Sequence, residues 1–174
     1  MKAALDANVL MQLLGIIGNS LYCPRTKQEI TNAEGRADAL FERFSEPGFQ
    51  LLIPAPVMAE VLVKVEPEHQ QSYINFVNGV TSLSIVPFDT KSIIECARLF
   101  DAQESKQLKK GGESKAKIAV DRQVVAIAIS NGAKELWTHD KTVFKKAGRV
   151  GLVAKSLADI EPIPAQKAME FSEQ

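Results

Sequence analysis

The sequence has few residues that bind soft metals, and its longest apolar run is far too short to cross a membrane. It contains two cysteines, two histidines and one tryptophan among 174 residues. A membrane-spanning helix needs about 20 consecutive apolar residues. Cys23 and Cys96 form no CxxC or Cys/His pattern, so we expect free, mostly buried thiols rather than a zinc site. Any metal would therefore have to be held by oxygen ligands.

The overall charge is zero, because 21 Lys and Arg balance 21 Asp and Glu. With 45% apolar and 24% charged residues, the composition is typical of a soluble globular domain. At the N-terminus, only three apolar residues separate Lys2 from Asp6, which is unlike a signal peptide. We therefore expect a cytoplasmic protein with no membrane segment.

Positive charge is concentrated in one part of the chain. Residues 106–149 contain eleven Lys and Arg but only four Asp and Glu, so this stretch carries +7 and the remainder −7. Such clustering mildly favours a polyanionic partner. The same pattern is also common on ordinary solvated surfaces, so it does not decide the function alone.

Short apolar segments alternate with segments of helical periodicity. We expect strands at 3–5, 49–54, 83–88, 135–138 and 151–153. We expect helices at 9–17, 33–45, 56–65, 70–77, 90–100, 120–131 and 141–147, with loops at 18–32 and 106–115. This alternation predicts an α/β protein, a three-layer α/β/α sandwich around a mostly parallel sheet of four or five strands. Residues 1–160 are expected to form one domain, and 161–174 a C-terminal tail.

Four acidic residues stand where a parallel sheet gathers its chemistry, at the carboxyl ends of strands or in the helix turns that follow. Asp6 follows the first strand and Asp140 the fourth, while Glu60 and Asp121 fall in the opening turns of helices. Taken singly, Asp6 and Asp140 could be helix caps, and Glu60 could be a solvated acid favoured by the helix dipole. The alternative is that all four acidic side chains converge on one functional site.

Asp121 is the acid that a purely structural role explains least well. Its helix is apolar nearly all round, and Asp121 shares a face with Val124, Val125 and Ala128. A buried charge is costly unless it has a compensating partner. We therefore favour a functional role for Asp121.

A cluster of four carboxylates would need neutralisation. Two carboxylates about 4 Å apart repel by roughly 4 kcal/mol at an effective dielectric near 20. Either some of them are protonated or a divalent cation neutralises them. Oxygen ligands without His or Cys suit Mg²⁺ or Mn²⁺, and such ions commonly carry out phosphate chemistry.

The order and spacing of these motifs resemble those of PIN domains, as found in VapC-type toxin ribonucleases. The first PIN motif is similar to residues 4–10 (ALDANVL), and the second to residues 56–62 (PVMAEVL). The third and fourth are similar to residues 121–128 (DRQVVAIA) and 136–140 (LWTHD). The resemblance runs from about residue 3 to 153. It implies a metal-dependent nuclease, usually an endoribonuclease, with Asp6, Glu60, Asp121 and Asp140 as the catalytic, metal-binding acids.

The resemblance also implies polar helpers around these acids. Asn8 and Thr138 would orient a ligand or a water, although a helix-start Asn and a plain strand Thr are alternatives. Lys117 and Arg122 flank Asp121 and are candidate phosphate contacts, with solvated helix charges as the alternative. Many relatives carry an acid at the position of Val143, so the fourth metal position is expected to be weak.

Two neighbours of Asp140 are expected to have structural roles. His139 could be a ligand or a proton carrier beside Asp140, but we expect an exposed loop residue, because successive residues at a strand end point to opposite sides. Trp137 could stack on a base, but in an apolar strand we expect it in the core.

The leading hypothesis is an endoribonuclease that uses Mg²⁺ or Mn²⁺ and an activated water to hydrolyse RNA phosphodiester bonds. The resemblance implies the toxin of a toxin–antitoxin pair, with a small antitoxin protein as partner, and a homodimer. The alternative is a catalytically weak PIN-like module that binds RNA or protein. A phosphatase or phosphoacceptor with Asp6 as nucleophile carries little weight, because Asn8 stands where haloacid-type enzymes need a second Asp.

Overall fold

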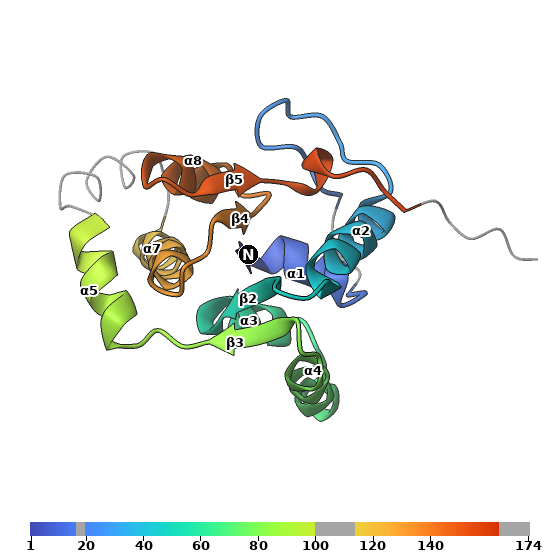
Figure 1. Cartoon of the computed structure of the whole chain (residues 1–174), viewed down its shortest axis with the longest axis horizontal. Helices are drawn as coiled ribbons and strands as arrows, with labels where there is room; N and C mark the ends of the chain where they lie inside the picture. Colours follow the sequence, from blue (N-terminus) through green and yellow to red (C-terminus); the bar gives the residue numbers. More distant parts are fainter. Residues whose placement is uncertain (17–19, 100–113, 164–174) are drawn as a thin grey trace, which may run out of the picture.

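The computed structural model describes residues 1–16, 20–99 and 114–163 of the chain (Figure 1). Its strands are β1 (Lys2–Leu5), β2 (Gln50–Pro54), β3 (Leu83–Val86), β4 (Glu135–Trp137) and β5 (Val153–Lys155). Its helices are α1 (Ala7–Leu13), α2 (Ala33–Ser45), α3 (Ala55–Leu62), α4 (Pro67–Gly79), α5 (Thr90–Leu99), α7 (Lys115–Ser130) and α8 (Lys141–Arg149), followed by the short 3₁₀ helix η1 (Leu157–Asp159). None of these helices is both long and apolar enough to span a bilayer.

The five strands form one sheet in the order β3-β2-β1-β4-β5, and every pairing is parallel. The central strand β1 pairs with β2 through Ala4 and Leu52, and with β4 through Leu5 and Trp137. The chain first adds strands on one side of β1 and then returns to add β4 on the other. The gap between β1 and β4 is therefore the point at which ligands bind in open parallel sheets.

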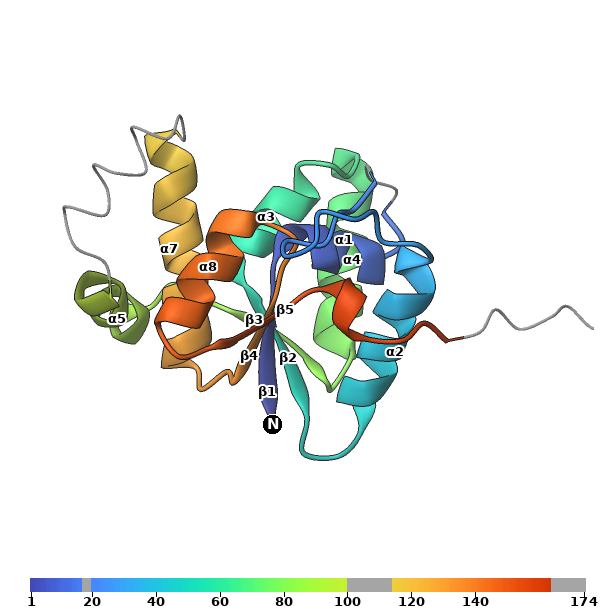
Figure 2. The same ribbon diagram turned by 90° about the horizontal axis from the view of Figure 1, so that it is seen from above.

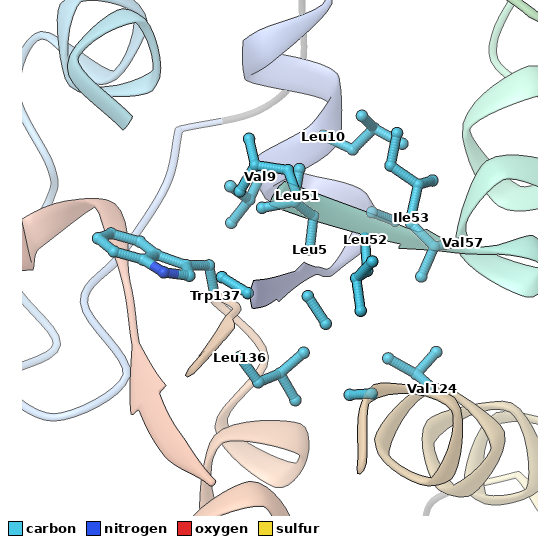
Figure 3. Close-up of a cluster of buried hydrophobic side chains, with 14 of the residues drawn as sticks. Leu5, Val9, Leu10, Leu51, Leu52, Ile53, Val57, Val124, Leu136 and Trp137 are labelled. Atoms are coloured by element: carbon cyan, nitrogen blue, oxygen red, sulfur yellow. The ribbon is translucent and has the colours of Figure 1, made fainter. Parts of the chain in front are cut away.

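Helices cover both faces of the sheet, which confirms the predicted α/β/α class. Figure 2 shows α1 and α2 on one face and α5, α7 and α8 on the other. The β1 residues Ala3, Ala4 and Leu5 are completely buried, as expected for a parallel strand covered on both sides. Figure 3 shows Val9 and Leu10 of α1 packing over one side of the sheet and Val124 of α7 over the other.

Local signals fix the start of the helices next to the strand ends. Asp6 is the N-cap of α1 and accepts a hydrogen bond from the Ala7 backbone N–H, so α1 begins two residues earlier than predicted. Asp140 is the N-cap of α8 and accepts from the backbone N–H groups of Thr142 and Val143. The cap interpretation of both aspartates is thus confirmed, and it also holds their carboxylates at the carboxyl ends of β1 and β4.

Helix α7 begins earlier than the sequence suggested. Ser114 caps it by accepting from the Lys117 backbone N–H at 3.1 Å, so Lys115 is helical, whereas we predicted a loop through Lys115 and a helix only from residue 120. Asp121 consequently lies in the second turn. The C-terminal stop is confirmed, because Gly132 follows the helix with a φ of +78°, a conformation that favours glycine. Residues 106–113 of the predicted loop lie outside the described part.

The remaining boundaries shift by a few residues. Helix α3 ends at Leu62 rather than at residue 65, α4 begins at Pro67, and the fifth strand is 153–155 rather than 151–153. The predicted loop is largely irregular over residues 20–32, with one antiparallel bridge between Tyr22 and Glu29. Most of the predicted tail, residues 164–174, lies outside the described residues.

Candidate functional site

Asp6, Thr138 and Asp140 are joined by hydrogen bonds at the carboxyl ends of β1 and β4. The Thr138 hydroxyl donates to Asp6 Oδ2 at 2.5 Å and accepts from the Asp140 backbone N–H at 3.0 Å. The Ala7 backbone N–H donates to Asp6 Oδ1 at 2.9 Å. Asp6 is only 9% exposed and Thr138 is completely buried. The parallel pairing of β1 and β4 therefore fixes one carboxylate rigidly and places a second beside it.

Asp6 is held in an environment that disfavours its negative charge. Its pKa is raised from 3.8 to about 6, mainly by burial and to a smaller extent by the nearby charges of Asp140 and Glu60, against the hydrogen bonds from Thr138 and Ala7. Asp140 and Glu60 are therefore each within electrostatic reach of Asp6. A cation at this point would relieve the repulsion.

Asp140 is fixed by partners on both of its carboxylate oxygens. Oδ1 accepts from the backbone N–H groups of Thr142 at 2.7 Å and Val143 at 3.1 Å, while Oδ2 accepts from Lys117 Nζ at 2.7 Å. Burial raises the pKa of Asp140, but the Lys117 ammonium and the cap hydrogen bonds outweigh it, so the pKa is lowered. Asp140 is therefore a carboxylate at neutral pH, and Lys117 pairs with an acid rather than standing apart from the cluster.

Asp121 has a buried partner that the sequence analysis missed. Lys146 Nζ on α8 donates to Asp121 Oδ2 at 3.2 Å, and the two side chains are only 3% and 9% exposed. Burial raises the pKa of Asp121, opposed by the ammonium of Lys146, while the charge of Asp140 raises it further. The available signal was helical spacing, because Lys146 follows Val143 by three positions and precedes Ala147, both of which are buried.

Glu60 and Asn8 lie at the open side of the site. Glu60 is exposed on α3 and reaches Asp6 electrostatically, and Asn8 on α1 is half-buried. Both line a cavity of about 600 Å³, together with Tyr22 and His139. The arrangement leaves a polar recess next to Glu60 and Asn8, large enough for part of a nucleotide chain.

His139 is not the exposed loop residue that we predicted. It is half-buried, and neither ring nitrogen has a hydrogen-bond partner among the described residues. Burial lowers the pKa of His139 to about 4, against weaker opposing effects of the Tyr22 backbone and Asp159. The prediction failed because the loop of residues 20–32 covers this strand end, which strand alternation alone does not reveal.

Arg122 lies on the side of α7 that faces α5. Burial raises the pKa of the Cys96 thiol on α5, and the charge of Arg122 opposes that rise. The contact of Arg122 with phosphate stays a prediction. Cys23 and Cys96 are free thiols, as expected, with Cys23 buried and Cys96 partly buried.

A third buried carboxylate, Glu135, stabilises the fold. Its Oε1 accepts from Arg43 at 3.1 Å and from Lys155 at 2.7 Å, and its Oε2 accepts from the Trp137 indole N–H at 2.9 Å. Burial raises the pKa of Glu135, but these partners outweigh it and lower the pKa. Trp137 itself is completely buried, which confirms its predicted place in the core.

The donor set around Asp6 fits a hard divalent cation in its chemistry, since it offers carboxylate, hydroxyl and amide oxygens. Within the described residues, however, no three His, Cys, Asp or Glu side chains are grouped closely enough to hold a metal ion as they stand. The acids occur instead as linked neighbours, and two of them are paired with lysines. The metal-binding role of Asp6, Glu60, Asp121 and Asp140 thus stays a prediction.

Comparisons with known proteins identify solved structures that share this fold. No family model matches the sequence, and no curated protein sequence is significantly similar to it. Among solved structures, VapBC2 from Rickettsia felis bound to a promoter DNA fragment is 17% identical, with 90% of this chain and 98% of that chain covered at a TM-score of 0.55. VapBC-1 from nontypeable Haemophilus influenzae is 16% identical, with coverages of 91% and 99% and a TM-score of 0.56.

A toxin-antitoxin complex from Klebsiella pneumoniae is 22% identical, with 87% of this chain and 95% of that chain covered at a TM-score of 0.52. The solved structures therefore cover nearly the whole described chain, at identities that establish the fold alone. This fold is the PIN-domain fold of VapC, so the resemblance inferred from the four acidic motifs is confirmed at the level of architecture.

Proposed function

We propose that this chain is a metal-dependent endoribonuclease, with its reaction centre at the carboxyl ends of β1 and β4. The observation that carries the proposal is the linked set of Asp6, Thr138 and Asp140, in which burial and neighbouring acids raise the pKa of Asp6 to about 6. Such a set favours a bound divalent cation. When bound, Mg²⁺ or Mn²⁺ supplies Lewis acidity toward a phosphoryl oxygen and lowers the pKa of an attacking water.

The chain's own residues have distinct tasks in this proposal. Asp6, Asp140 and Glu60 would hold the cation, and Asp121, within electrostatic reach of Asp140, would add negative charge to the site. Thr138 keeps the Asp6 carboxylate in one orientation through its hydroxyl. The Lys117 side chain is 48% exposed beside Asp140, where its ammonium is well placed for a substrate phosphate.

RNA is the substrate class that the charge pattern of the sequence and the cavity favour. Residues 106–149 carry a net charge of +7 in the sequence, and positive charge attracts a phosphate backbone. The cavity beside Glu60, with Asn8 and Tyr22 on its walls, offers amide and aromatic groups of the kind that bind unpaired bases. A single-stranded RNA fits these features.

Cleavage of single-stranded RNA tests the proposal. Purified protein should cut with Mg²⁺ or Mn²⁺ and stop with EDTA. Asp140→Asn is the sharpest variant, because Asn retains the capping oxygen of α8 and removes the charge. We expect at least about a 100-fold loss of cleavage rate, whereas Asp38→Asn, an exposed acid on α2, should cleave normally. Full activity of Asp140→Asn would contradict the proposed site.

The VapBC structures support a further element, that this chain is the toxin of a toxin–antitoxin pair. We expect it to bind a small protein encoded by the neighbouring reading frame and to form a homodimer. Expression of the chain alone should arrest growth, and co-expression of that neighbour should restore it. Light scattering of the purified chain reports the dimer.

A second candidate is a PIN-like module that binds RNA or protein without turnover. It is favoured by the lysine pairing of two acids and by the lack, among the described residues, of three ligands grouped around one point. Calorimetry separates the two candidates. Tight RNA binding with no Mn²⁺ heat and no cleavage would select the binding module.

A further inference from the structure

Two lysines cross between α7 and α8 and neutralise half of the acidic site. Lys117 of α7 pairs with Asp140 at the start of α8, and Lys146 of α8 pairs with Asp121 of α7. The four predicted acids and these two ammonium groups leave a net charge of −2. One divalent cation balances that charge, whereas two would leave the site positive.

The two lysines differ in how firmly they are held. The Lys117 side chain is 48% exposed, so its ammonium can leave Asp140 for water at little cost. The Lys146 side chain is 3% exposed, and its carboxylate partner is 9% exposed. Separating a buried ion pair leaves an unpaired charge in a poorly solvated place, which is strongly unfavourable. Lys146 is therefore a permanent part of the site.

From this geometry we infer that Lys146 takes the place of a second metal ion, so that the site binds a single divalent cation at the Asp6–Asp140 end. The inference rests on the proposed metal dependence and specifies its stoichiometry. Asp121 then acts through the pair with Lys146 rather than as the centre of a separate metal position. A second cation next to the fixed ammonium would meet direct repulsion.

Counting bound Mn²⁺ tests this inference on the full chain, without any assay of cleavage. We expect one bound Mn²⁺ per parent chain, measured by calorimetry and by the loss of the electron paramagnetic resonance signal of free Mn²⁺. In Lys146→Met, the unpaired Asp121 should admit a second Mn²⁺ at least about tenfold more tightly than the parent does. Lys145→Met removes the same charge from an exposed neighbour and should retain one ion with unchanged affinity.

A double variant guards against a folding defect in Lys146→Met. The double variant Lys146→Met/Asp121→Asn removes both buried charges together. Circular dichroism reports whether it is folded. This variant should still bind one Mn²⁺, because the Asp6–Asp140 end is intact. Two Mn²⁺ per parent chain, or complete loss of Mn²⁺ binding in the folded double variant, would overturn the inference while leaving metal dependence in place. A parent chain that binds no Mn²⁺ would overturn the proposed function as well.

Discussion

Replacing Asp6 by Asn removes a buried negative charge while keeping one oxygen in its position. In the folded chain burial raises the pKa of Asp6 to about 6 from an ordinary value of 3.8. The folded state therefore binds this proton more tightly than the unfolded state does. Stability associated with Asp6 is fully present below about pH 4 and is lost as the pH rises to about 6.

The size of the effect follows from the pKa difference. About two pKa units correspond to roughly 3 kcal/mol of unfolding free energy at neutral pH, at ~1.4 kcal/mol per unit. Asn offers one acceptor in place of two, so one of the hydrogen bonds from Thr138 and Ala7 is lost, at about 1 kcal/mol. We expect Asp6→Asn to be about 2 kcal/mol more stable than the parent at neutral pH.

Urea unfolding in EDTA measures this difference, with the single, fully buried Trp137 as the fluorescent probe. The advantage of Asp6→Asn should be present at about pH 7.5 and absent at about pH 4. His139, whose pKa burial lowers to about 4, destabilises the fold as the pH falls below about 6.5, but it does so in both proteins and cancels in the comparison. A variant that is less stable than the parent at both pH values would refute the reasoning.

Two predictions concern the frame that carries the site. Glu135→Gln should lower the unfolding free energy by about 3 kcal/mol in urea titrations, because Arg43 and Lys155 lose a buried carboxylate; an unchanged midpoint would mean that the network is not structural. Gly132→Ala should cost about 1 kcal/mol in thermal melts, owing to its φ of +78° with no steric contact to add to the strain, and an equally stable variant would contradict that cause.

Local patterns in the sequence were sufficient for most of the architecture. Helix α2 has the predicted bounds, Ala33–Ser45, because its apolar period is regular and Pro47-Gly48 ends it. The parallel sheet follows from the alternation of strands and helices, and the positions of Asp6 and Asp140 follow from the strand ends. The predicted start of α7 was wrong because the first turn of this helix is polar. The apolar periodicity that indicates a helix begins only at residue 118.

Interactions between distant segments explain what the sequence did not reveal. The apolar surroundings of Asp121 correctly predicted that its charge needs a compensating partner. That partner is Lys146, which lies 25 positions away on another helix. Periodicity within one helix cannot identify such a pair. The burial of His139 likewise depends on the packing of residues 20–32 against the end of β4. Asp121 and His139 thus owe their environments to tertiary packing, which a single sequence encodes only indirectly.

The place of β1 at the centre of the sheet has a consequence for synthesis. The ribosome makes this strand first, and β2 can pair with one of its edges once residue 54 has emerged. The other edge waits for β4, whose first residue follows roughly eighty residues later, or about 4–16 s at 5–20 residues per second. During that interval the nascent chain presents an apolar strand with an open edge, a form that aggregates readily and that chaperones bind.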